Sequence, residues 1–358
     1  MVNLLKHVHM GIANTARLGL MKKPQLMNLY WESTQRCNLK CKHCFKDSGE
    51  GNLQEELTAD EMKTQLSRIA KRYDANGIAF CTTGGELFLR EDIFEVIAFA
   101  DELGFKCEIT TNGTLIDESV VRRIKNAGVR KAIISLDGNR ETHDGFRAVA
   151  GSYDKAIRSV RLLKDADFLD ALQVNTVYNK ENLGQLRELY EIVKNSGATV
   201  WHIASIKPLG RASRNKFLLL DAGDYRVLFD FIKEMRKKRD DMEITYEHSN
   251  FLGLSYEFEV RDKCFICQAG IITASIMYNG DVFACNNIPR LPHLIQGNIR
   301  ERDFCDIWEN DFKLFREENR TSCGKCQKCR RWKYCYGGPF HTWDFEADQP
   351  KTCLEEIL

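Results

Sequence analysis

Short runs of apolar and β-branched residues alternate with longer amphipathic segments from about residue 27 to residue 239. Each short run is typical of a buried strand, and each longer segment repeats its apolar residues at helical spacing. The runs predict six strands, at residues 27–32, 77–82, 106–111, 131–136, 171–178 and 199–206. The longer segments predict helices at residues 58–73, 90–103, 117–127, 152–165, 182–195 and 222–239.

The first of these helices carries the most complete local signal. Thr58 is followed three residues later by Glu61, which is the arrangement of a capping box at a helix start. Met62, Leu66 and Ile69 then recur at helical intervals, so that one face of the segment is apolar. The sequence therefore predicts an amphipathic helix that begins directly after Thr58.

Strands that alternate with helices predict an α/β protein with a parallel sheet. Six strand–helix units are too few for a closed eight-stranded barrel, so the pattern leaves an open partial barrel or a doubly wound sheet. In both architectures ligands bind at the carboxyl ends of the strands, where the loops into the helices lie. We therefore look for chemistry in the residues that directly follow each predicted strand.

The two ends of the chain depart from this repeat. Residues 1–25 predict a single helix, and beyond residue 250 the rhythm breaks into short segments with Gly, Asn and Cys. Such composition is typical of a metal-stapled region with little core of its own. We expect three parts: an N-terminal helical segment at 1–25, the strand–helix repeat at 26–240, and the cysteine-rich segment at 241–358.

The charge balance excludes some partners. The 358 residues carry 52 basic and 51 acidic side chains, a net charge of +1, which removes the electrostatic case for nucleic acid or an anionic membrane. No apolar run reaches the roughly 18 residues of a membrane span. Residues 1–20 mix His, Lys, Arg and Asn into their apolar positions and do not resemble a signal peptide. We therefore expect a cytoplasmic protein.

Fourteen cysteines are the unusual feature of the composition. In a reducing compartment, clustered thiols bind metal or carry out redox chemistry more often than they form disulfides. Cys37, Cys41 and Cys44 follow the first predicted strand, in the loop where a site is expected. A structural zinc ion takes four protein ligands, and His43 is an awkward fourth beside Cys44. Three thiolates on a four-iron cluster would instead leave one iron open for a substrate or cofactor.

Polar residues follow the next strands as well. The second strand leads into Gly84, Gly85 and Glu86; two glycines let a backbone approach a ligand closely, and a carboxylate accepts hydrogen bonds from an ammonium group. The third and fourth strands lead into the polar runs 110–114 and 135–138. The sequence thus predicts that several strand ends contribute to one site.

The spacing Cys37-x3-Cys41-x2-Cys44 after a first strand, with Gly84-Gly85-Glu86 after the second, resembles the radical S-adenosylmethionine (radical SAM) superfamily. The resemblance implies a partial (β/α)6 TIM-like barrel whose three cysteines hold a catalytic [4Fe–4S] cluster. By the same resemblance, the open iron chelates S-adenosylmethionine (SAM), and one electron cleaves it to a 5′-deoxyadenosyl radical. Leu87 stands where the family usually has a proline.

The resemblance also implies cofactor-binding residues. Glu86 would hold the methionine amino group, and Ser135 and Arg147 would help to bind the ribose and the carboxylate. Taken from the residues alone, Ser135 could also be a polar residue of a strand-end turn, and Arg147 a surface arginine. The cofactor-binding candidates are His43, Gly84, Gly85, Glu86, Asn112, Ser135 and Arg147.

A second group of cysteines lies near the C-terminus. Cys326-x2-Cys329-x5-Cys335 stands in a run of basic and aromatic residues, where cations can offset the charge of a thiolate cluster. Upstream, Cys267 is followed by Gly280 and then by Cys285 after four more residues. Spacing alone does not separate zinc from iron–sulfur ligation, so both stay open for these cysteines.

This order of cysteines resembles the SPASM extension of radical SAM enzymes that modify peptides and proteins. The resemblance implies one or two auxiliary [4Fe–4S] clusters, although Pro339 stands where the pattern has a further cysteine. Four cysteines suffice for one complete cluster: Cys326, Cys329, Cys335 and Cys353. The other set is Cys264, Cys267 and Cys285, with Cys323, a peptide group, a carboxylate such as Asp344, or solvent as the fourth ligand.

We therefore expect an enzyme that modifies a peptide or protein substrate by hydrogen abstraction, through a crosslink, a dehydrogenation or an epimerisation. Its electron donor would be a flavodoxin or a ferredoxin, with neither nucleic acid nor membrane as a partner. Two alternatives remain: a radical SAM enzyme that acts on a small molecule, and a non-catalytic adaptor in which zinc staples a degenerate barrel.

Overall fold

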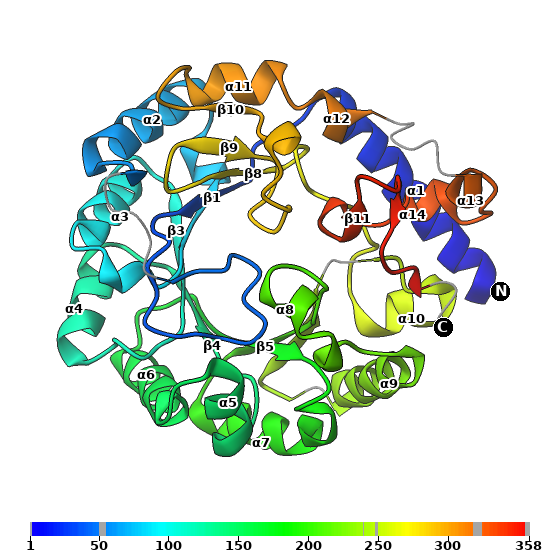
Figure 1. Ribbon diagram of the computed structural model, residues 1–358, viewed down its shortest axis with the longest axis horizontal. Coiled ribbons are helices and arrows are strands. Elements are labelled where there is room, and N and C mark those ends of the chain that lie inside the picture. The colour runs from blue at the N-terminus through cyan, green and yellow to red at the C-terminus, as the bar shows by residue number, and fades with distance from the viewer. Residues whose placement is uncertain (1, 50–54, 239, 248–249, 318–323, 355–358) are drawn as a thin grey trace.

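The computed structural model describes residues 2–49, 55–238, 240–247, 250–317 and 324–354. Helices form a ring around a curved sheet, and the N-terminal helix lies beside the C-terminal elements (Figure 1). The strands of the sheet are β1 (Asn28–Glu32), β2 (Ala79–Thr83), β3 (Lys106–Thr111), β4 (Lys131–Ser135), β5 (Ala171–Tyr178), β6 (Val200–Ser205), β7 (Glu243–Tyr246), β8 (Thr273–Ile276), β9 (Asp281–Phe283) and β10 (Gly297–Asn298). A separate hairpin consists of β11 (Trp343–Asp344) and β12 (Gln349–Pro350).

Five helices alternate with the strands as the sequence predicts, and a sixth follows β6. These are α2 (Ala59–Arg72), α3 (Ile93–Glu102), α4 (Glu118–Asn126), α6 (Ser152–Ala166), α7 (Leu186–Ser196) and α9 (Ala222–Lys238). The other helices are α1 (Val2–Lys22), α5 (Arg140–Arg147), α8 (Arg211–Arg214), α10 (Gly253–Val260), α11 (Phe304–Asn310), α12 (Lys313–Arg316), α13 (Gly324–Gln327) and α14 (Trp332–Cys335).

The large sheet has the strand order β10-β9-β8-β1-β2-β3-β4-β5-β6-β7. From β1 to β7 the strands are parallel and lie side by side in chain order, without the reversal that defines a doubly wound sheet. The sheet ends at β7 and β10 without closing. The predicted α/β partial barrel is therefore confirmed, and the six predicted strands are β1 to β6.

Four strands of the large sheet were not predicted, and all of them follow residue 240. β7 adds to one edge of the six-stranded sheet, while β8 pairs in parallel with the free edge of β1, Asn28 opposite Thr273. β9 and β10 continue the sheet in antiparallel order. The cysteine-rich segment thus contributes strands to both edges of the barrel sheet.

The capping box at α2 is confirmed. The Thr58 hydroxyl accepts a hydrogen bond from Glu61 N, and Glu61 Oε2 accepts one from Thr58 N at 2.7 Å. Met62, Leu66 and Ile69 are fully buried against the sheet, as their spacing predicts. Local sequence and tertiary packing therefore agree at this helix.

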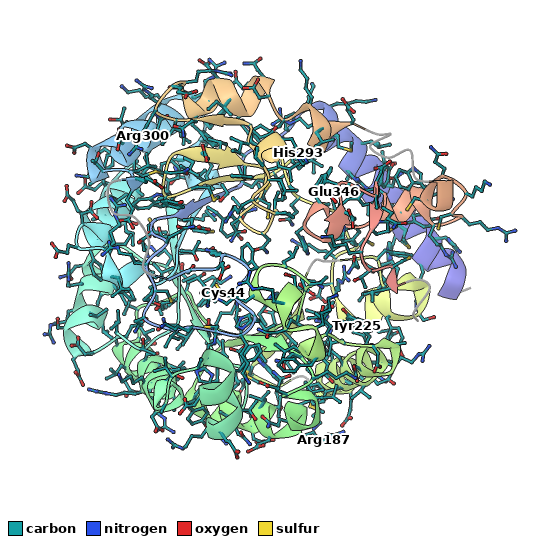
Figure 2. All side chains as sticks on the ribbon, viewed as in Figure 1. Cys44, Arg187, Tyr225, His293, Arg300 and Glu346 are labelled. Atoms are coloured by element: carbon teal, nitrogen blue, oxygen red, sulfur yellow. The ribbon has the colours of Figure 1, made fainter. Side chains whose placement is uncertain are left out.

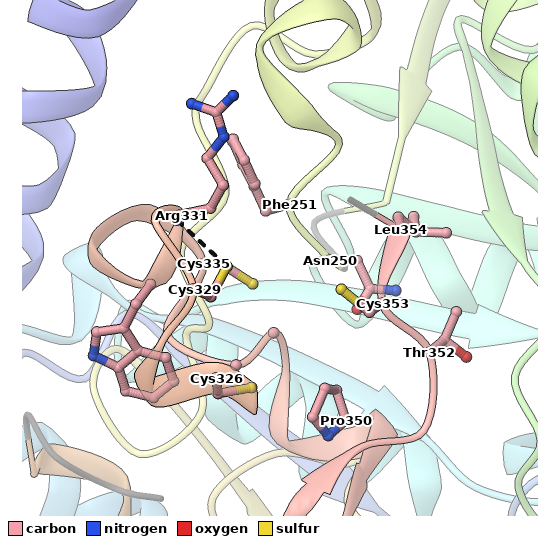
Figure 3. A pocket seen from close by; sticks show the side chains of 13 residues that line it. Asn250, Phe251, Cys326, Cys329, Arg331, Cys335, Pro350, Thr352, Cys353 and Leu354 are labelled. Atoms are coloured by element: carbon pink, nitrogen blue, oxygen red, sulfur yellow. Dashed lines mark hydrogen bonds between the residues drawn. The ribbon is translucent and has the colours of Figure 1, made fainter. Parts of the chain in front are cut away.

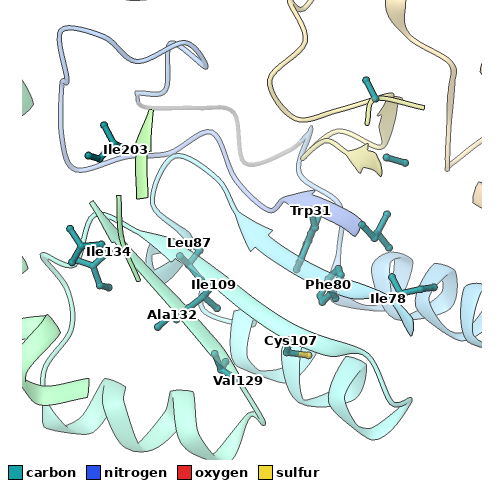
Figure 4. Packing of buried hydrophobic residues seen from close by; sticks show 14 of the residues in the cluster. Trp31, Ile78, Phe80, Leu87, Cys107, Ile109, Val129, Ala132, Ile134 and Ile203 are labelled. Atoms are coloured by element: carbon teal, nitrogen blue, oxygen red, sulfur yellow. The ribbon is translucent and has the colours of Figure 1, made fainter. Parts of the chain in front are cut away.

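The main core lies between the sheet and the ring of helices (Figure 4). Trp31 of β1 stacks on Phe80 of β2, with the ring centroids 6.2 Å apart. Ile109 and Ile134 continue the same layer on β3 and β4 and are buried. The large side chains of neighbouring strands thus pack outward onto the helices, which leaves the carboxyl ends of the strands to polar residues.

The C-terminal segment shares this core. Trp308 and Phe312 are buried in the same apolar cluster as the barrel strands. On the outside, α1 contacts α10 and α14, and the Arg17 guanidinium lies 3.4 Å from the centroid of the Tyr336 ring. Among the described residues, none of the helices combines the length and the apolar character needed to cross a bilayer.

Candidate active site and auxiliary cysteine site

A cavity of about 210 Å³ lies at the carboxyl ends of the parallel strands. Cys37, Cys41 and Cys44 all line it from the loop after β1. Figure 2 shows Cys44 near the middle of the ring, far from rim residues such as Arg187 and Arg300. The structure therefore brings the three predicted cluster ligands to one cavity, at the edge of the sheet where ligands were expected.

The cysteine loop is suited to thiolates that bind iron. Burial, and then the neighbouring thiols, raise the pKa of Cys37 to about 11, and burial raises the pKa of Cys41. These thiols therefore need nearby positive charge to ionise. Two N–H groups face the sulfurs: Leu39 N donates to Cys37 Sγ at 3.4 Å, and Arg147 Nη1 donates to Cys41 Sγ at 3.6 Å.

The donor set fits a cluster better than one tightly held ion. Three thiols without a fourth protein ligand match a four-iron cluster that keeps an open iron. Within the described ranges, no three His, Cys, Asp or Glu side chains lie close enough together to hold a single metal ion. The cavity adjoining the thiols leaves room for a cofactor.

Gly84 and Gly85 line the cavity, but their lack of a side chain also serves the chain itself. A Cβ on Gly85 would overlap the Arg36 carbonyl, and one on Gly84 would lie 2.8 Å from Thr34 O. Gly85 N donates to Thr34 O at 2.7 Å and Glu86 N to Arg36 O at 2.8 Å. The two glycines thus let the start of the cysteine loop lie directly against the end of β2.

Glu86 is fully buried and lies behind the cavity lining. Its carboxylate accepts hydrogen bonds from Thr111 Oγ1 at 2.6 Å and from Asn112 N at 2.8 Å. Burial raises the pKa of Glu86, while these hydrogen bonds act in the opposite direction. In this arrangement the carboxylate fixes the end of β3, and the sequence pattern did not indicate that orientation.

The other predicted residues do line the cavity. Asn112 donates to Asn38 Oδ1 at 2.9 Å and so joins the end of β3 to the cysteine loop. Ser135 at the end of β4 and Asn175 on β5 face the same space. Ile206, which directly follows β6, lies outside this lining in a small apolar cluster.

Lys46 and Arg211 are cavity residues that the sequence interpretation missed. Lys46 Nζ donates to Thr83 Oγ1 and to Gly84 O, both at 3.2 Å. Arg211, in the loop region after β6, donates to Cys41 O at 3.2 Å. The sequence held a signal for both residues: Lys46 follows the cysteine motif by two residues, and Arg211 follows the parallel strand β6.

His43 and Arg147 meet at the end of α5. The His43 ring stacks on Phe146 with centroids 4.3 Å apart, and its buried Nδ1 has no hydrogen-bond partner within the described part of the chain. Burial, and then the Arg147 charge, lower the pKa of His43 to about 3, so its ring is neutral. Arg147 is buried and donates from Nε to Asp137 Oδ2 at 2.6 Å. The arginine therefore has a buried carboxylate partner, unlike a surface arginine.

A second cavity, of about 230 Å³, lies beside α13 and α14 (Figure 3). Asn250 and Phe251 line its opposite side, and Arg331 N donates to Cys329 Sγ at 3.4 Å. It brings together the four cysteines that the sequence grouped as one complete set: Cys326, Cys329, Cys335 and Cys353.

The other C-terminal set is less compact. Cys264 lines a small separate cavity against α1. Burial raises the pKa of Cys285 to about 11, and the nearby Cys267 contributes to the shift. Cys323 lies outside the described residues, and Asp344 accepts hydrogen bonds from the backbone of its own hairpin.

Three cysteines outside the clusters are packed in the interior. Cys107 and Cys305 are buried in the apolar core. Cys81 lies on β2, two residues before Thr83 of the cavity lining, and its buried Sγ is 3.7 Å from Glu108 Oε2. Their surroundings give them packing roles within the described residues.

Comparison with known proteins agrees with this geometry. A family model of the radical SAM superfamily matches residues 31–193, and one of the SPASM iron–sulfur cluster-binding domain matches residues 267–330. The AdoMet-dependent heme synthase of Methanosarcina barkeri is 29% identical, over 89% of this chain and 92% of the relative. The mycofactocin maturase MftC of Mycolicibacterium smegmatis is 32% identical, over 87% and 77%.

Solved structures share the fold. Streptococcus suis SuiB bound to S-adenosylmethionine superimposes with a TM-score of 0.75 at 21% identity, covering 96% of this chain and 80% of that one. The enzyme anSMEcpe with bound AdoMet and a Cp18Cys peptide gives 0.71 at 20% identity, covering 91% and 93%. With the motifs and the two cysteine cavities, these matches show that the chain is an enzyme of the radical SAM superfamily with a SPASM domain, and that its cofactors are SAM and [4Fe–4S] clusters.

Proposed function

We propose that this enzyme oxidises its substrate by hydrogen abstraction and passes the remaining electron to one auxiliary [4Fe–4S] cluster in the second cavity. The observation that carries the proposal is the convergence of Cys326, Cys329, Cys335 and Cys353 on that cavity. Four cysteine ligands complete a cluster without an open iron, and such a cluster is suited to electron transfer.

The first cavity supplies the residues for the initiating step. Cys37, Cys41 and Cys44 would hold the catalytic cluster, and Ser135 and Arg147 would bind polar groups of SAM. When bound, the cluster and SAM supply a 5′-deoxyadenosyl radical that removes a hydrogen atom from the substrate. The role of the chain is to hold these groups together at the carboxyl ends of the parallel strands.

The electron balance explains the need for the second site. Removal of a hydrogen atom leaves the substrate one electron short of a closed shell, and a desaturated or decarboxylated product forms when one further electron departs. In our proposal the auxiliary cluster accepts that electron, and a proton or carbon dioxide leaves the substrate. A flavodoxin or ferredoxin then exchanges electrons with the enzyme. The exposed cations Lys328, Arg330 and Lys333 beside Cys329 suit the docking of an acidic carrier.

Our first candidate for the substrate is a carboxylate-bearing heme precursor. The support is the AdoMet-dependent heme synthase of Methanosarcina barkeri, which matches nearly the whole of both chains. Lys46 and Arg211 line the cavity, but each pairs with a carboxylate, Glu32 and Asp47 respectively, so the candidate rests on the relative and not on the cavity charge. The small-molecule alternative of the sequence interpretation thus becomes the first candidate.

A peptide or protein remains the second candidate, as the SPASM resemblance implies. The mycofactocin maturase match, at 32% identity, favours it. We propose a cytoplasmic location for the enzyme, because its cysteines are clustered, and clustered thiols in a reducing compartment bind metal more often than they form disulfides.

The test is an anaerobic turnover assay with the reconstituted enzyme, SAM and a low-potential reductant. Iron-coproporphyrin III and a cysteine-containing peptide are offered separately, and 5′-deoxyadenosine and product masses are measured. Substrate-dependent 5′-deoxyadenosine with an oxidised tetrapyrrole supports the first candidate, and an oxidised peptide supports the second. Turnover that survives loss of both Cys326 and Cys329 would refute the role of the auxiliary cluster.

A further inference from the structure

Asp137 lies two residues beyond the end of β4 and connects three elements of the first site. Its side chain is completely buried, and its two oxygens have different partners. Oδ1 accepts a hydrogen bond from Val177 N on β5 at 2.8 Å, and Oδ2 accepts from Arg147 Nε at 2.6 Å. Its backbone N–H donates to His143 Nδ1 at 3.1 Å. Asp137 therefore joins the end of β4 to β5 and to α5.

Arg147 carries this connection to the cysteine loop. One side of its guanidinium contacts Asp137, while Nη1 donates to Cys41 Sγ at 3.6 Å. The backbone continues the contact, since Arg147 O accepts from Lys40 N at 3.3 Å and Phe146 O accepts from Lys42 N at 2.9 Å. The end of α5 therefore holds the loop on both sides of Cys41.

Both members of the buried pair, Asp137 and Arg147, are charged. Burial is the largest single effect and opposes the ionised form of each group, but the attraction between the Asp137 carboxylate and the Arg147 guanidinium, together with the other nearby charges and hydrogen bonds, outweighs it. The pKa of Asp137 is accordingly lowered and that of Arg147 is raised. A neutral residue at position 137 could still accept from Val177 N, so the strand contact alone does not require the charge. Among the described residues, Arg147 is the ion-pair partner of the Asp137 carboxylate.

We propose that Asp137 is a positioning residue of the catalytic cluster and of SAM: through Arg147 it directs one N–H at the Cys41 sulfur and orients the remaining N–H groups toward the cavity. Of the pair Asp137 and Arg147, the resemblance to the family assigns a role only to Arg147. The proposal rests on the cofactors and not on the substrate class. Its tests therefore need neither substrate nor the auxiliary cluster.

The experiment compares Asp137→Asn, Arg147→Lys and their combination with a matched control, Asp154→Asn. Asp154 on α6 pairs with Arg140 at the other end of α5, and both side chains are more than half exposed. All variants carry Cys326→Ala and Cys329→Ala, so that only the first cluster gives an EPR signal. Iron content, the EPR spectrum of the reduced cluster without SAM, and the Kd for SAM are measured anaerobically.

Asp137→Asn and Arg147→Lys are each expected to weaken SAM binding about tenfold and to change the EPR spectrum, because a charge-assisted hydrogen bond is lost. The combined variant should be no worse than the poorer single variant, since both changes break one connection. Asp154→Asn should leave both readouts unchanged. Additive losses, or Asp137→Asn with wild-type Kd and spectrum, would overturn the proposal.

Asp137→Glu tests the proposal if the asparagine variant does not fold. It retains the charge, so it should keep the wild-type EPR spectrum more closely than Arg147→Lys does. Combined with Arg147→Lys, it should add no further loss of SAM affinity. A Glu variant whose loss adds in full to that of Arg147→Lys would show that Asp137 acts independently of Arg147, which contradicts the proposal.

Discussion

Arg290 Nη2 lies 2.6 Å from Glu32 Oε2, so a residue of the C-terminal segment contacts the carboxyl end of the first barrel strand. The same Glu32 oxygen lies 3.3 Å from Lys46 Nζ, and Lys46 lines the first cavity. The Glu32 side chain is only 2% exposed. A single buried carboxylate therefore links the cysteine loop to the segment that carries the auxiliary cysteines.

Glu32→Gln removes the charge that both cations share. Because Lys46 then stays buried without its counter-ion, the free energy of unfolding should fall by about 3 kcal/mol. Arg300→Gln, at the exposed pair with Glu61, is the matched control and should cost less than about 1 kcal/mol. Urea unfolding of the iron-free protein measures both, and equal losses would contradict the importance of the buried link.

Gly85→Ala tests the close approach of the cysteine loop to β2. The added Cβ overlaps the Arg36 carbonyl, so the loop must move and the first cluster should not assemble. Gly145→Ala on α5 is the control, because a Cβ there meets nothing within 4 Å, and alanine favours the helix. Iron content and SAM binding are the readouts. A Gly85→Ala protein with full iron and normal SAM binding would refute the steric argument.

Iron analysis tests the number of clusters. Two clusters predict about eight irons and eight sulfides per chain, and a third predicts about twelve. With one auxiliary cluster, Cys326→Ala with Cys329→Ala should lower the iron content to about four. Cys264→Ala should leave about eight, and a loss of four irons in that variant would show that the upstream set also holds a cluster.

His143 predicts a loss of stability in acid. Burial, and then the Arg147 charge, lower the pKa of His143 to about 4, from 6.5 in the unfolded chain. The unfolded state therefore binds a proton first as the pH falls, and the stabilising contribution present above pH 6.5 is lost toward pH 4. The loss approaches about 3 kcal/mol at pH 4. Urea unfolding of iron-free protein should show this decline, and His143→Gln should show a flatter one.

Charge reversal tests the surface beside Cys329. Lys328→Glu, Arg330→Glu and Lys333→Glu together should weaken the binding of an acidic flavodoxin and remove most of its salt dependence. Lys237→Glu with Lys238→Glu, at the exposed basic end of α9, is the control and should have little effect. Titration of the holoenzyme at low and high salt gives both values. Unchanged binding in the triple variant would place the carrier elsewhere.

Local patterns account for the elements that could be predicted. The strands β1 to β6 and the helix α2 follow from apolar periodicity and from the Thr58 capping box, both of which are properties of neighbouring residues. The helix α5 was missed because its buried residues include His143 and Arg147, so its sequence lacks an apolar stripe. Its stability derives from contacts with Asp137 and the cysteine loop, which are visible only in three dimensions.

The site shows the same division. Spacing was enough to group Cys37, Cys41 and Cys44, because all three occupy one short loop. The orientation of Glu86 was not predictable, because it depends on hydrogen bonds donated by Thr111 and Asn112 from the adjacent strand. The four auxiliary cysteines were grouped by pattern, although Cys353 reaches its partners only through the fold of the last segment.

The pairing of β8 with β1 limits how far this enzyme can be treated as modular. The C-terminal segment supplies the hydrogen-bonding neighbour of the first barrel strand, so its removal would expose an unpaired apolar edge that is prone to aggregate. We expect the two segments to unfold as one cooperative unit. An exchange of auxiliary domains between relatives would replace part of the barrel wall together with the cluster ligands. The junctions of such chimeras should therefore preserve the pairing register of β8 with β1, rather than follow the domain boundary in the sequence.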